Sequence, residues 1–419
     1  MSKRRHFSGW NALVIASLAM VCTLPGRTQG LGLITDPLLR DLGLDELRWA
    51  NVNLVATLIG AAFCIGVGRL IDRFGARRVL SLVVALLGAS IIAMSRVHGV
   101  ATLLLTVTLT RGFGQSALSV VSLAIVGKWF VRKLSLAMGL YSILLGIGFM
   151  IAFPGVQAAV EHMGWRHVWF VMGWVMILIV APLSAIILRS TPESIGQVVD
   201  GNASPAQHDR PQDSPIVGAT LAEALATPVF WAFGIASSAF GLISSGILLF
   251  NEALLRELGY GSNVFRELQV VLVLSGLIAN FAGGWAGQKW SLGKLMCLGM
   301  LLMGVAMAAL PIAHAPGAVL AYAICMGVSG GIVTVVFFTC WGKIFGRQHL
   351  GKIQGAAQLL TVLASAVGPL LVAWSLHVTG SYKPLLHWAG PISIVLGIAC
   401  WLVPMPTQTA YPGLSAVQA

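Results

Sequence analysis

The stretch G68-R-L-I-D-R-F-G-A-R-R-V79 lies between two apolar runs, each long enough to cross a bilayer. Its charged residues are Arg69, Asp72, Arg73, Arg77 and Arg78. Gly68 and Gly75 favour a close approach of the chain and a tight turn. Short basic loops between spans remain on the cytoplasmic side of a membrane. The stretch therefore predicts a polytopic membrane protein with this loop in the cytoplasm.

The composition is that of an integral membrane protein. Of 419 residues, 57% are hydrophobic and only 10% are charged, whereas a soluble domain has about 25% charged residues. A membrane helix needs roughly 20 apolar residues, and the continuous apolar runs favour helices over the alternating pattern of a barrel. The net charge of +12 is scattered over short loops. It therefore indicates orientation and does not form a nucleic-acid-binding surface.

Twelve spans are predicted, with a polar linker between the sixth and the seventh. The spans cover residues 9–36, 47–70, 77–96, 101–129, 134–160, 167–188, 228–252, 267–289, 294–313, 317–344, 352–377 and 385–404. Prolines and acidic residues are frequent in the linker, which is typical of a flexible or partly ordered connection. We expect a six-helix bundle over 1–190, a cytoplasmic linker over 191–226, and a second bundle over 227–419 that ends in a short cytoplasmic tail.

An internal repeat supports this division. Asp36-Pro-Leu-Leu-Arg-Asp-Leu-Gly43 matches Glu252-Ala-Leu-Leu-Arg-Glu-Leu-Gly259 at an offset of 216. Gly127-Lys128-x-Phe130-x-Arg132 matches Gly342-Lys343-x-Phe345-x-Arg347 at an offset of 215. The opening stretch has a degenerate copy, G284-W-A-G-Q-K-W-S-L-G-K294, in which Gln288 takes the place of Asp72. Two similar six-helix bundles in tandem are therefore predicted.

The distribution of basic residues predicts the orientation. The loops on the side of the N-terminus contain 17 lysines and arginines, and the loops on the other side contain 7. We expect the chain to lie in the cell (inner) membrane. The positive-inside rule then places both termini in the cytoplasm. The cysteines have no metal-ligand spacing, and no Walker motif or hydrolase elbow is present, so we expect no metal, no cofactor and no enzyme activity.

Two arginines lie inside predicted spans, where a charge is expensive and marks a functional candidate. Arg111 lies about ten residues into the fourth span, roughly 15 Å along a helix. Arg27 lies in L24-P-G-R-T-Q-G-L-G32, whose proline and glycines favour a bent or locally unwound helix. No carboxylate lies deep in a span, so the sequence predicts an anionic ligand held by guanidinium groups. Alternatively, Arg111 binds helix carbonyls and Arg27 extends to the outer interface.

The pattern G-x-x-x-D-R-x-G-x-R-R in the opening stretch closely resembles the signature between the second and third helices of the major facilitator superfamily. The twelve spans, the repeat and the linker fit the same family, which implies an all-α fold of two six-helix bundles. The resemblance also implies that this loop locks the cytoplasmic side through charges and helix dipoles; the alternative is a plain topology signal. The residues given this role are Gly68, Asp72, Arg73, Gly75, Arg77 and Arg78.

In that family the first, fourth, seventh and tenth helices line a central cavity, which implies that Arg27 and Arg111 face it. The run L109-T-R-G-F-G-Q115 resembles the fourth-helix motif. The predicted substrate-binding residues are Arg27, Arg111, Thr28, Gln29, Asn251, Thr334 and Trp341, with Ser244, Ser245 and Thr339 as weaker candidates. The runs P25-G-R-T-x-G, D36-P-L-L-R-D-L-G-L and T191-P-E-x-x-G resemble the group that includes monocarboxylate and oxalate/formate carriers.

The predicted function is secondary transport of a small organic anion, such as a monocarboxylate, by alternating access. Symport with a proton would neutralise the anion. The first alternative is a carrier of neutral or cationic compounds, such as a drug exporter, although such carriers often hold a membrane-embedded acid that this chain lacks. The second alternative is a non-transporting membrane sensor with the carrier fold. We expect a monomer in a lipid bilayer, with a small-molecule substrate and no nucleic-acid partner.

Overall fold

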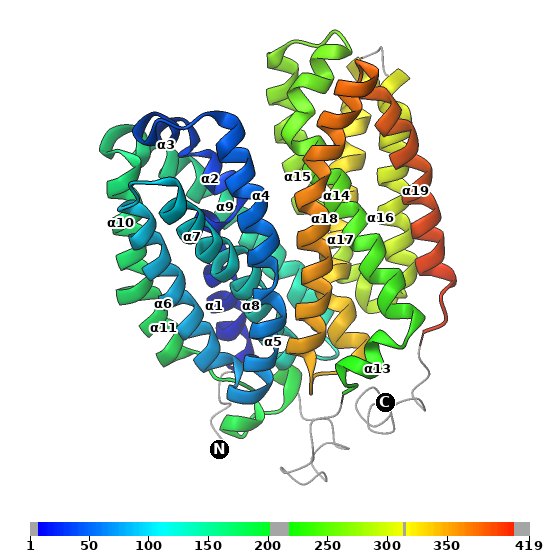
Figure 1. Cartoon of the computed structure of the whole chain (residues 1–419). Helices are drawn as coiled ribbons and strands as arrows, with labels where there is room; N and C mark the ends of the chain where they lie inside the picture. Colours follow the sequence, from blue (N-terminus) through cyan, green and yellow to red (C-terminus); the bar gives the residue numbers. More distant parts are fainter. Residues whose placement is uncertain (1–6, 202–217, 313–315, 406–419) are drawn as a thin grey trace. The chain divides into compact units, whose positions relative to one another are not determined.

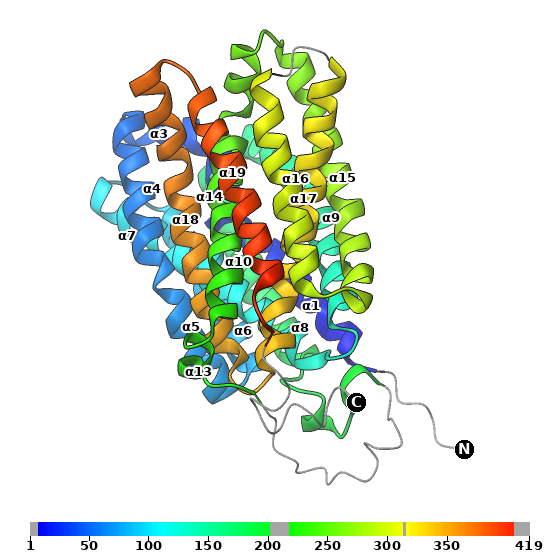
Figure 2. The same ribbon diagram turned by 90° about the vertical axis from the view of Figure 1, so that its right-hand side faces the viewer.

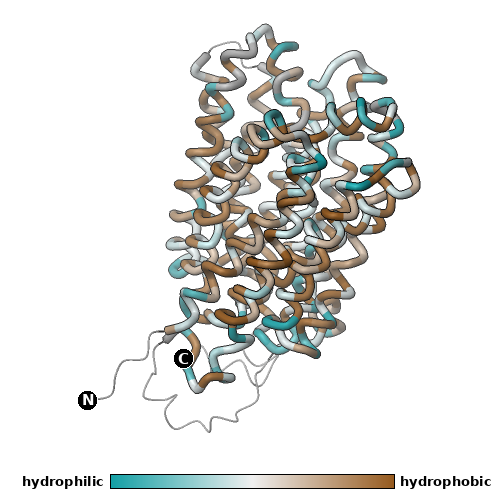
Figure 3. Tube along the Cα trace, turned by 90° about the vertical axis from the view of Figure 1, so that its left-hand side faces the viewer, coloured by the Kyte–Doolittle hydropathy of each residue, from teal (hydrophilic) through white to brown (hydrophobic). Residues whose placement is uncertain are grey.

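The structure is a computed structural model, and it describes residues 7–201, 218–312 and 316–405. These residues are mainly helical, and no strand occurs among them. Eleven helices within the described ranges are long and apolar enough to cross a membrane, and α1 (Gly9–Val21) is a shorter apolar helix. Figure 3 shows hydrophobic residues along most of the helical tube. The chain is therefore an all-α, multi-pass membrane protein, as predicted.

The helices of the first half follow the predicted spans closely. They are α1 (Gly9–Val21), η1 (Leu24–Gly26), α2 (Thr28–Gly32), α3 (Thr35–Leu42), α4 (Glu46–Ala61), α5 (Phe63–Phe74), α6 (Ala76–Ser95), α7 (Val100–Thr110), the π-helix η2 (Arg111–Leu118), α8 (Ser119–Trp129), α9 (Leu134–Met163), α10 (Trp165–Val175), the π-helix η3 (Met176–Val180) and α11 (Ala181–Ile187). Three spans are composite: α4 with α5, α7 with η2 and α8, and α10 with η3 and α11.

The second half contains six long helices after short pieces of linker structure. The elements are η4 (Glu193–Ile195), η5 (Val199–Gly201), α13 (Leu221–Leu225), α14 (Pro228–Glu257), α15 (Ser262–Lys289), α16 (Leu292–Ala309), η6 (Leu310–Ile312), α17 (Pro316–Phe345), α18 (Leu350–Thr379) and α19 (Lys383–Leu402). The middle of the predicted linker and most of the predicted tail lie outside the described residues.

Two compact units divide the chain. Unit 1 comprises Met1–Leu134, Leu144–Thr220 and Phe345–Leu359, and unit 2 comprises Ser135–Ile143, Leu221–Ile344 and Leu360–Ala419. In unit 1, α6 packs against α10 and α11, and α1 packs against α8 (Figure 1). In unit 2, α16 packs along α19 (Figure 2). The first part of α18 is assigned to unit 1 and its remainder to unit 2, whereas Ser135–Ile143 of α9 is assigned to unit 2 and the rest of that helix to unit 1.

The first span is broken at the position that the sequence predicted. Helix α1 ends at Val21, η1 makes one tight turn, and Arg27 has an extended backbone with φ −93° and ψ 155° before α2 begins. Close packing selects glycine here, because a Cβ on Gly26 would lie 2.5 Å from the carbonyl oxygen of Thr110. The break therefore brings the first span against the fourth, directly beside Arg111.

Candidate functional site

Arg111 is buried in unit 1 and is held by neutral acceptors. Its Nη1 donates to Thr28 Oγ1 at 2.9 Å and to Gln115 Oε1 at 2.7 Å, and its Nη2 donates to Asn53 Oδ1 at 3.0 Å. The residue is 3% exposed. Its side chain thus joins the first, second and fourth spans through three charge-assisted hydrogen bonds.

The electrostatic balance at Arg111 is incomplete. Its Nε is buried and has no hydrogen-bond partner among the described residues, and none of the ion pairs formed within the described ranges involves Arg111. Taking a charge out of water without a counter-charge is costly. All three of these hydrogen bonds are accepted by side-chain oxygens, whereas the alternative prediction was that Arg111 binds helix carbonyls. Within the described part of the chain, the charge of Arg111 is therefore matched by dipoles and not by a counter-charge.

Local structure explains how these groups meet. Arg111 is the first residue of the π-helix η2 and Gln115 lies on the next turn, where π-helical turns often mark functional positions. Thr28 opens α2 immediately after the break in the first span. Asn53 lies in the middle of α4. Asn53 and Gln115 are not among the binding residues predicted from the sequence. Each is an amide inside an apolar span, and Gln115 follows the intramembrane Arg111 by four residues, which are the signals that could have identified them.

Arg27 extends toward the middle of its own span. Its Nε donates to Thr23 Oγ1 at 2.7 Å, and its Nη2 lies 3.4 Å from Met20 Sδ and 3.5 Å from Ser119 Oγ. The guanidinium carbon is 5.3 Å from the centre of the Phe149 ring, which is within the range of a cation–π interaction. The side chain therefore runs back along the chain from α2 toward α1, and not outward to the interface.

The remaining predicted binding residues divide between the two units. In unit 1, Thr28 and Gln29 are exposed. In unit 2, the buried Asn251 accepts a hydrogen bond from the Tyr322 hydroxyl at 3.2 Å, Thr334 is half-buried, and Trp341 is fully buried. The rings of Phe230 and Phe337 lie 5.2 and 5.9 Å from that of Trp341. The roles of the predicted residues in substrate binding stay predictions, and the same holds for Ser244, Ser245 and Thr339.

Asp72 joins three segments of unit 1. Its Oδ1 and Oδ2 accept the backbone N–H groups of Gly351 and Lys352, each at 3.2 Å, and Lys128 Nζ lies 3.6 Å from Oδ1. The two N–H groups belong to the first turn of α18, where backbone donors are unsatisfied and the helix dipole is positive. Gly68 permits this contact, because a Cβ there would lie 2.5 Å from the Gly351 carbonyl oxygen.

The other residues of the predicted lock have separate contacts. Arg77 Nε donates to the carbonyl of Ala185 near the end of α11 at 2.7 Å. Gly75, with φ +82°, makes the turn between α5 and α6. The Arg73 guanidinium lies 5.2 Å from the centre of the Phe74 ring, and both Arg73 and Arg78 are exposed. Of this set, only the Asp72 carboxylate reaches α18 by a hydrogen bond among the described residues.

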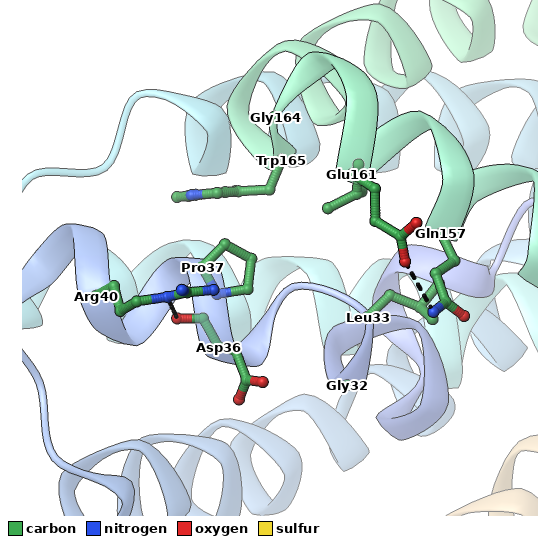
Figure 4. A pocket seen from close by; sticks show the side chains of 10 residues that line it. Gly32, Leu33, Asp36, Pro37, Arg40, Gln157, Glu161, Gly164 and Trp165 are labelled. Atoms are coloured by element: carbon green, nitrogen blue, oxygen red, sulfur yellow. Dashed lines mark hydrogen bonds between the residues drawn. The ribbon is translucent and has the colours of Figure 1, made fainter.

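A cavity of about 660 Å³ lies elsewhere in unit 1, between α2–α3 and the end of α9. Figure 4 shows Asp36, Arg40 and Trp165 across this cavity from Gln157 and Glu161. Arg40 Nε donates to the Asp36 carbonyl, and Gln157 donates to Glu161. Two carboxylates and one guanidinium line this cavity, so its lining has a net negative charge that disfavours an organic anion. We assign the anion candidate to Arg111 and not to this cavity.

The fold defines a class, an all-α protein that crosses the membrane many times. The model of the Major Facilitator Superfamily matches residues 12–277 and 232–416. The chain therefore belongs to the Major Facilitator Superfamily, as its loop motif predicted, and its fold class of two six-helix bundles is confirmed. The family consists of transporters.

Individual relatives are distant. The chain is 26% identical to monocarboxylate transporter 13 of Bos taurus, over 69% of this chain and 64% of that protein. It thus spans slightly less than two thirds of that relative's length. It is 25% identical to monocarboxylate transporter 11 of Homo sapiens, over 92% of this chain and 81% of that protein. The solved structure of the human organic anion transporter MFSD10 (TETRAN) matches with a TM-score of 0.66 and 16% identity, over 96% of this chain and all of that chain, which shows the fold alone.

Proposed function

We propose that this chain is a secondary active transporter that moves a small organic anion of the monocarboxylate type by alternating access. The observation that carries the proposal is the buried Arg111, which has three neutral acceptors and an Nε without a hydrogen bond. The monocarboxylate transporters among its relatives support the same substrate class.

The donors that remain on Arg111 suit a carboxylate. A guanidinium has five N–H donors, and the contacts with Thr28, Gln115 and Asn53 use three of them. A carboxylate that binds side-on needs Nε and Nη2 together. Because Nε is buried, an anion reaches it only when the surrounding helices move apart. In the proposed cycle Arg27, Thr28 and Gln29 guide the anion to this position. Asn251, Thr334 and Trp341 stay predicted substrate-binding residues of the second half.

Asp72 is the proposed lock of the cytoplasmic side, together with Gly68, Arg73, Gly75, Arg77 and Arg78. Its carboxylate neutralises the positive start of α18 and pairs with Lys128. Such contacts stabilise one conformation, and transport requires that they break and re-form. The excess of lysine and arginine on the side of the N-terminus supports placing both termini in the cytoplasm.

Uptake into proteoliposomes tests the substrate class. We expect radiolabelled acetate, lactate or pyruvate to accumulate, and we expect Arg111→Ala and Arg27→Ala each to reduce uptake at least tenfold. Arg48→Ala is the control, because its side chain is 67% exposed. If both site variants transport carboxylates normally, the anion proposal is wrong. Thermal stabilisation by amphiphilic cations and not by carboxylates would favour a drug-exporter type, and tight binding without flux would favour a sensor.

Proton coupling has its own test. A proton that travels with the anion would neutralise it during crossing, so we propose symport. Acidifying the side from which the anion enters should accelerate uptake, and a protonophore should remove the acceleration. An uptake rate that does not change with the proton gradient, at constant carboxylate concentration, would reject symport. Such a result would not contradict the proposed anion site.

A further inference from the structure

The linker residue Asp200 is buried and strained. It lies in η5, is 8% exposed, and is the only non-glycine residue with positive φ, at 61°, in the described part of the chain. This conformation is unfavourable for a residue that has a Cβ, although aspartate tolerates it better than most. A buried carboxylate in a connecting segment therefore needs a compensating interaction.

That interaction is a set of consecutive backbone N–H groups. Val131 and Lys133 donate to Asp200 Oδ1 at 3.2 and 3.1 Å, and Arg132 donates to Oδ2 at 2.8 Å. These groups immediately precede α9, which begins at Leu134. They lie next to the N-terminus of the helix, where the positive end of the helix dipole favours a negative charge. Asp200 thus supplies a negative charge at the start of α9.

The start of α18 receives its negative charge from a different place. Asp72 accepts the N–H groups of Gly351 and Lys352 there. In the internal repeat, α18 corresponds to α9, and position 72 corresponds to position 288, at an offset of 216. A symmetric protein would therefore have an acid at 288 facing α9. The residue is Gln288.

The helix contact itself is repeated faithfully. In unit 1, a Cβ on Gly68 would lie 2.5 Å from the carbonyl oxygen of Gly351. In unit 2, a Cβ on Gly284 would lie 2.8 Å from the carbonyl oxygen of Ser135. Both partners are displaced by the offset of the repeat. The second half thus keeps the packing of this contact.

The charge at the contact is not repeated. Lys128 lies 3.6 Å from the Asp72 carboxylate in unit 1. Its counterpart Lys343 donates instead to the carbonyl of Gly287 at 2.6 Å in unit 2. A main-chain carbonyl has replaced a carboxylate as the partner of the lysine. The second half therefore has the equivalent lysine, but its copy of the motif has no acid at the equivalent position.

We propose that Asp200 replaces the acid that the second copy of the motif lacks. It is a positioning residue that anchors the start of α9, as Asp72 anchors the start of α18. The first part of the linker, which contains Asp200, thereby takes part in conformational change and does more than connect the two halves. The consequence for the rate of transport rests on the proposed function, whereas the anchoring does not.

Hydrogen–deuterium exchange and thermal unfolding of the purified full chain test the anchoring without any substrate. We expect Asp200→Asn to accelerate exchange of the amides at 131–133 at least tenfold and to lower the Tm. Asp36→Asn is the matched control, because Asp36 is an exposed acid in the same unit. Unchanged exchange at 131–133 in Asp200→Asn would overturn the proposal.

A rescue experiment separates anchoring from general stabilisation. Gln288→Asp restores the acid at the repeat position, and we expect it to recover the Tm and the transport rate of Asp200→Asn without restoring protection at 131–133. Failure of this rescue, with Gln288→Asp alone folded and stable, would show that Asp200 does not replace the motif acid. If exchange and Tm behave as expected but no carboxylate is transported, the anchoring stands and the proposed substrate is wrong.

Discussion

Asp41 and Glu257 occupy equivalent places in the two halves of the repeat, and each binds the chain at the start of the last span of its own half. Asp41 Oδ2 accepts from Trp165 Nε1 at 3.0 Å and from Arg166 Nε at 2.8 Å. Glu257 accepts from the Ser381 hydroxyl and from the Tyr382 N–H. The donors are related by the same offset as the two acids. The repeat thus preserves a connection within each bundle, although the donor groups differ.

The interaction of Asp41 with Arg166 makes the stability of the protein depend on pH. The hydrogen bond from Arg166 holds the pKa of the Asp41 carboxyl below its ordinary value. Because the folded pKa is lower than the unfolded value of about 3.9, the contribution is present above that value and is lost as pH falls through the folded pKa. We expect the Tm to fall more steeply below about pH 5 in the wild type than in Asp41→Asn. The effect is at most about 1 kcal/mol, since the side chain is 45% exposed.

Asp36→Asn is the control for the pH experiment, since this exposed acid precedes Asp41 on α3. Parallel Tm profiles for the wild type and Asp41→Asn between pH 3 and 7 would contradict the prediction.

Gly68→Ala should destabilise the protein. The new Cβ would overlap the main-chain oxygen of Gly351 at 2.5 Å, and backbone cannot yield as a flexible side chain does. Overpacking of this kind costs about 1–3 kcal/mol. Gly66→Ala is a matched control two residues earlier in α5, because its Cβ would meet nothing within 4 Å. Thermal unfolding in detergent measures both, and equal Tm values for the two variants would reject the close contact.

Arg111→Lys should abolish most transport although it keeps the charge. Lysine offers a point charge and cannot reproduce the planar fork that contacts Thr28, Gln115 and Asn53. We expect uptake of labelled monocarboxylate to fall at least tenfold, with Arg48→Lys unchanged. Wild-type uptake by Arg111→Lys would show that the bidentate geometry is not required.

Asn53→Asp should block the site from within. The new carboxylate would sit where the amide oxygen lies 3.0 Å from Arg111 Nη2, so the arginine would gain a permanent counter-ion. We expect carboxylates to lose their stabilising effect on the Tm of this variant and to keep it in Asn53→Ala. The shift induced by the ligand is the proper measure, because either change also removes the bond from Asn53 Nδ2 to the Trp49 carbonyl. A normal shift in Asn53→Asp would contradict an anion site at Arg111.

The sequence by itself determined the membrane class, the approximate spans, the duplication, and the break beside Arg27. These features depend on local chemistry: apolar length, the conformational preferences of proline and glycine, and a motif whose residues are adjacent in the chain. The same reasoning found the intramembrane charge of Arg111, because an isolated cation in an apolar run is visible without coordinates.

Only the tertiary structure decided which groups meet. The partners of Arg111 are Asn53, Thr28 and Gln115, and the first two come from other spans. The partner of Val131 is Asp200, 69 residues along the chain. No local pattern specifies such pairs, because a hydrogen bond depends on the rotation and depth at which separate helices pack. The sequence thus located the charges, and the packing of the helices determined what each charge contacts.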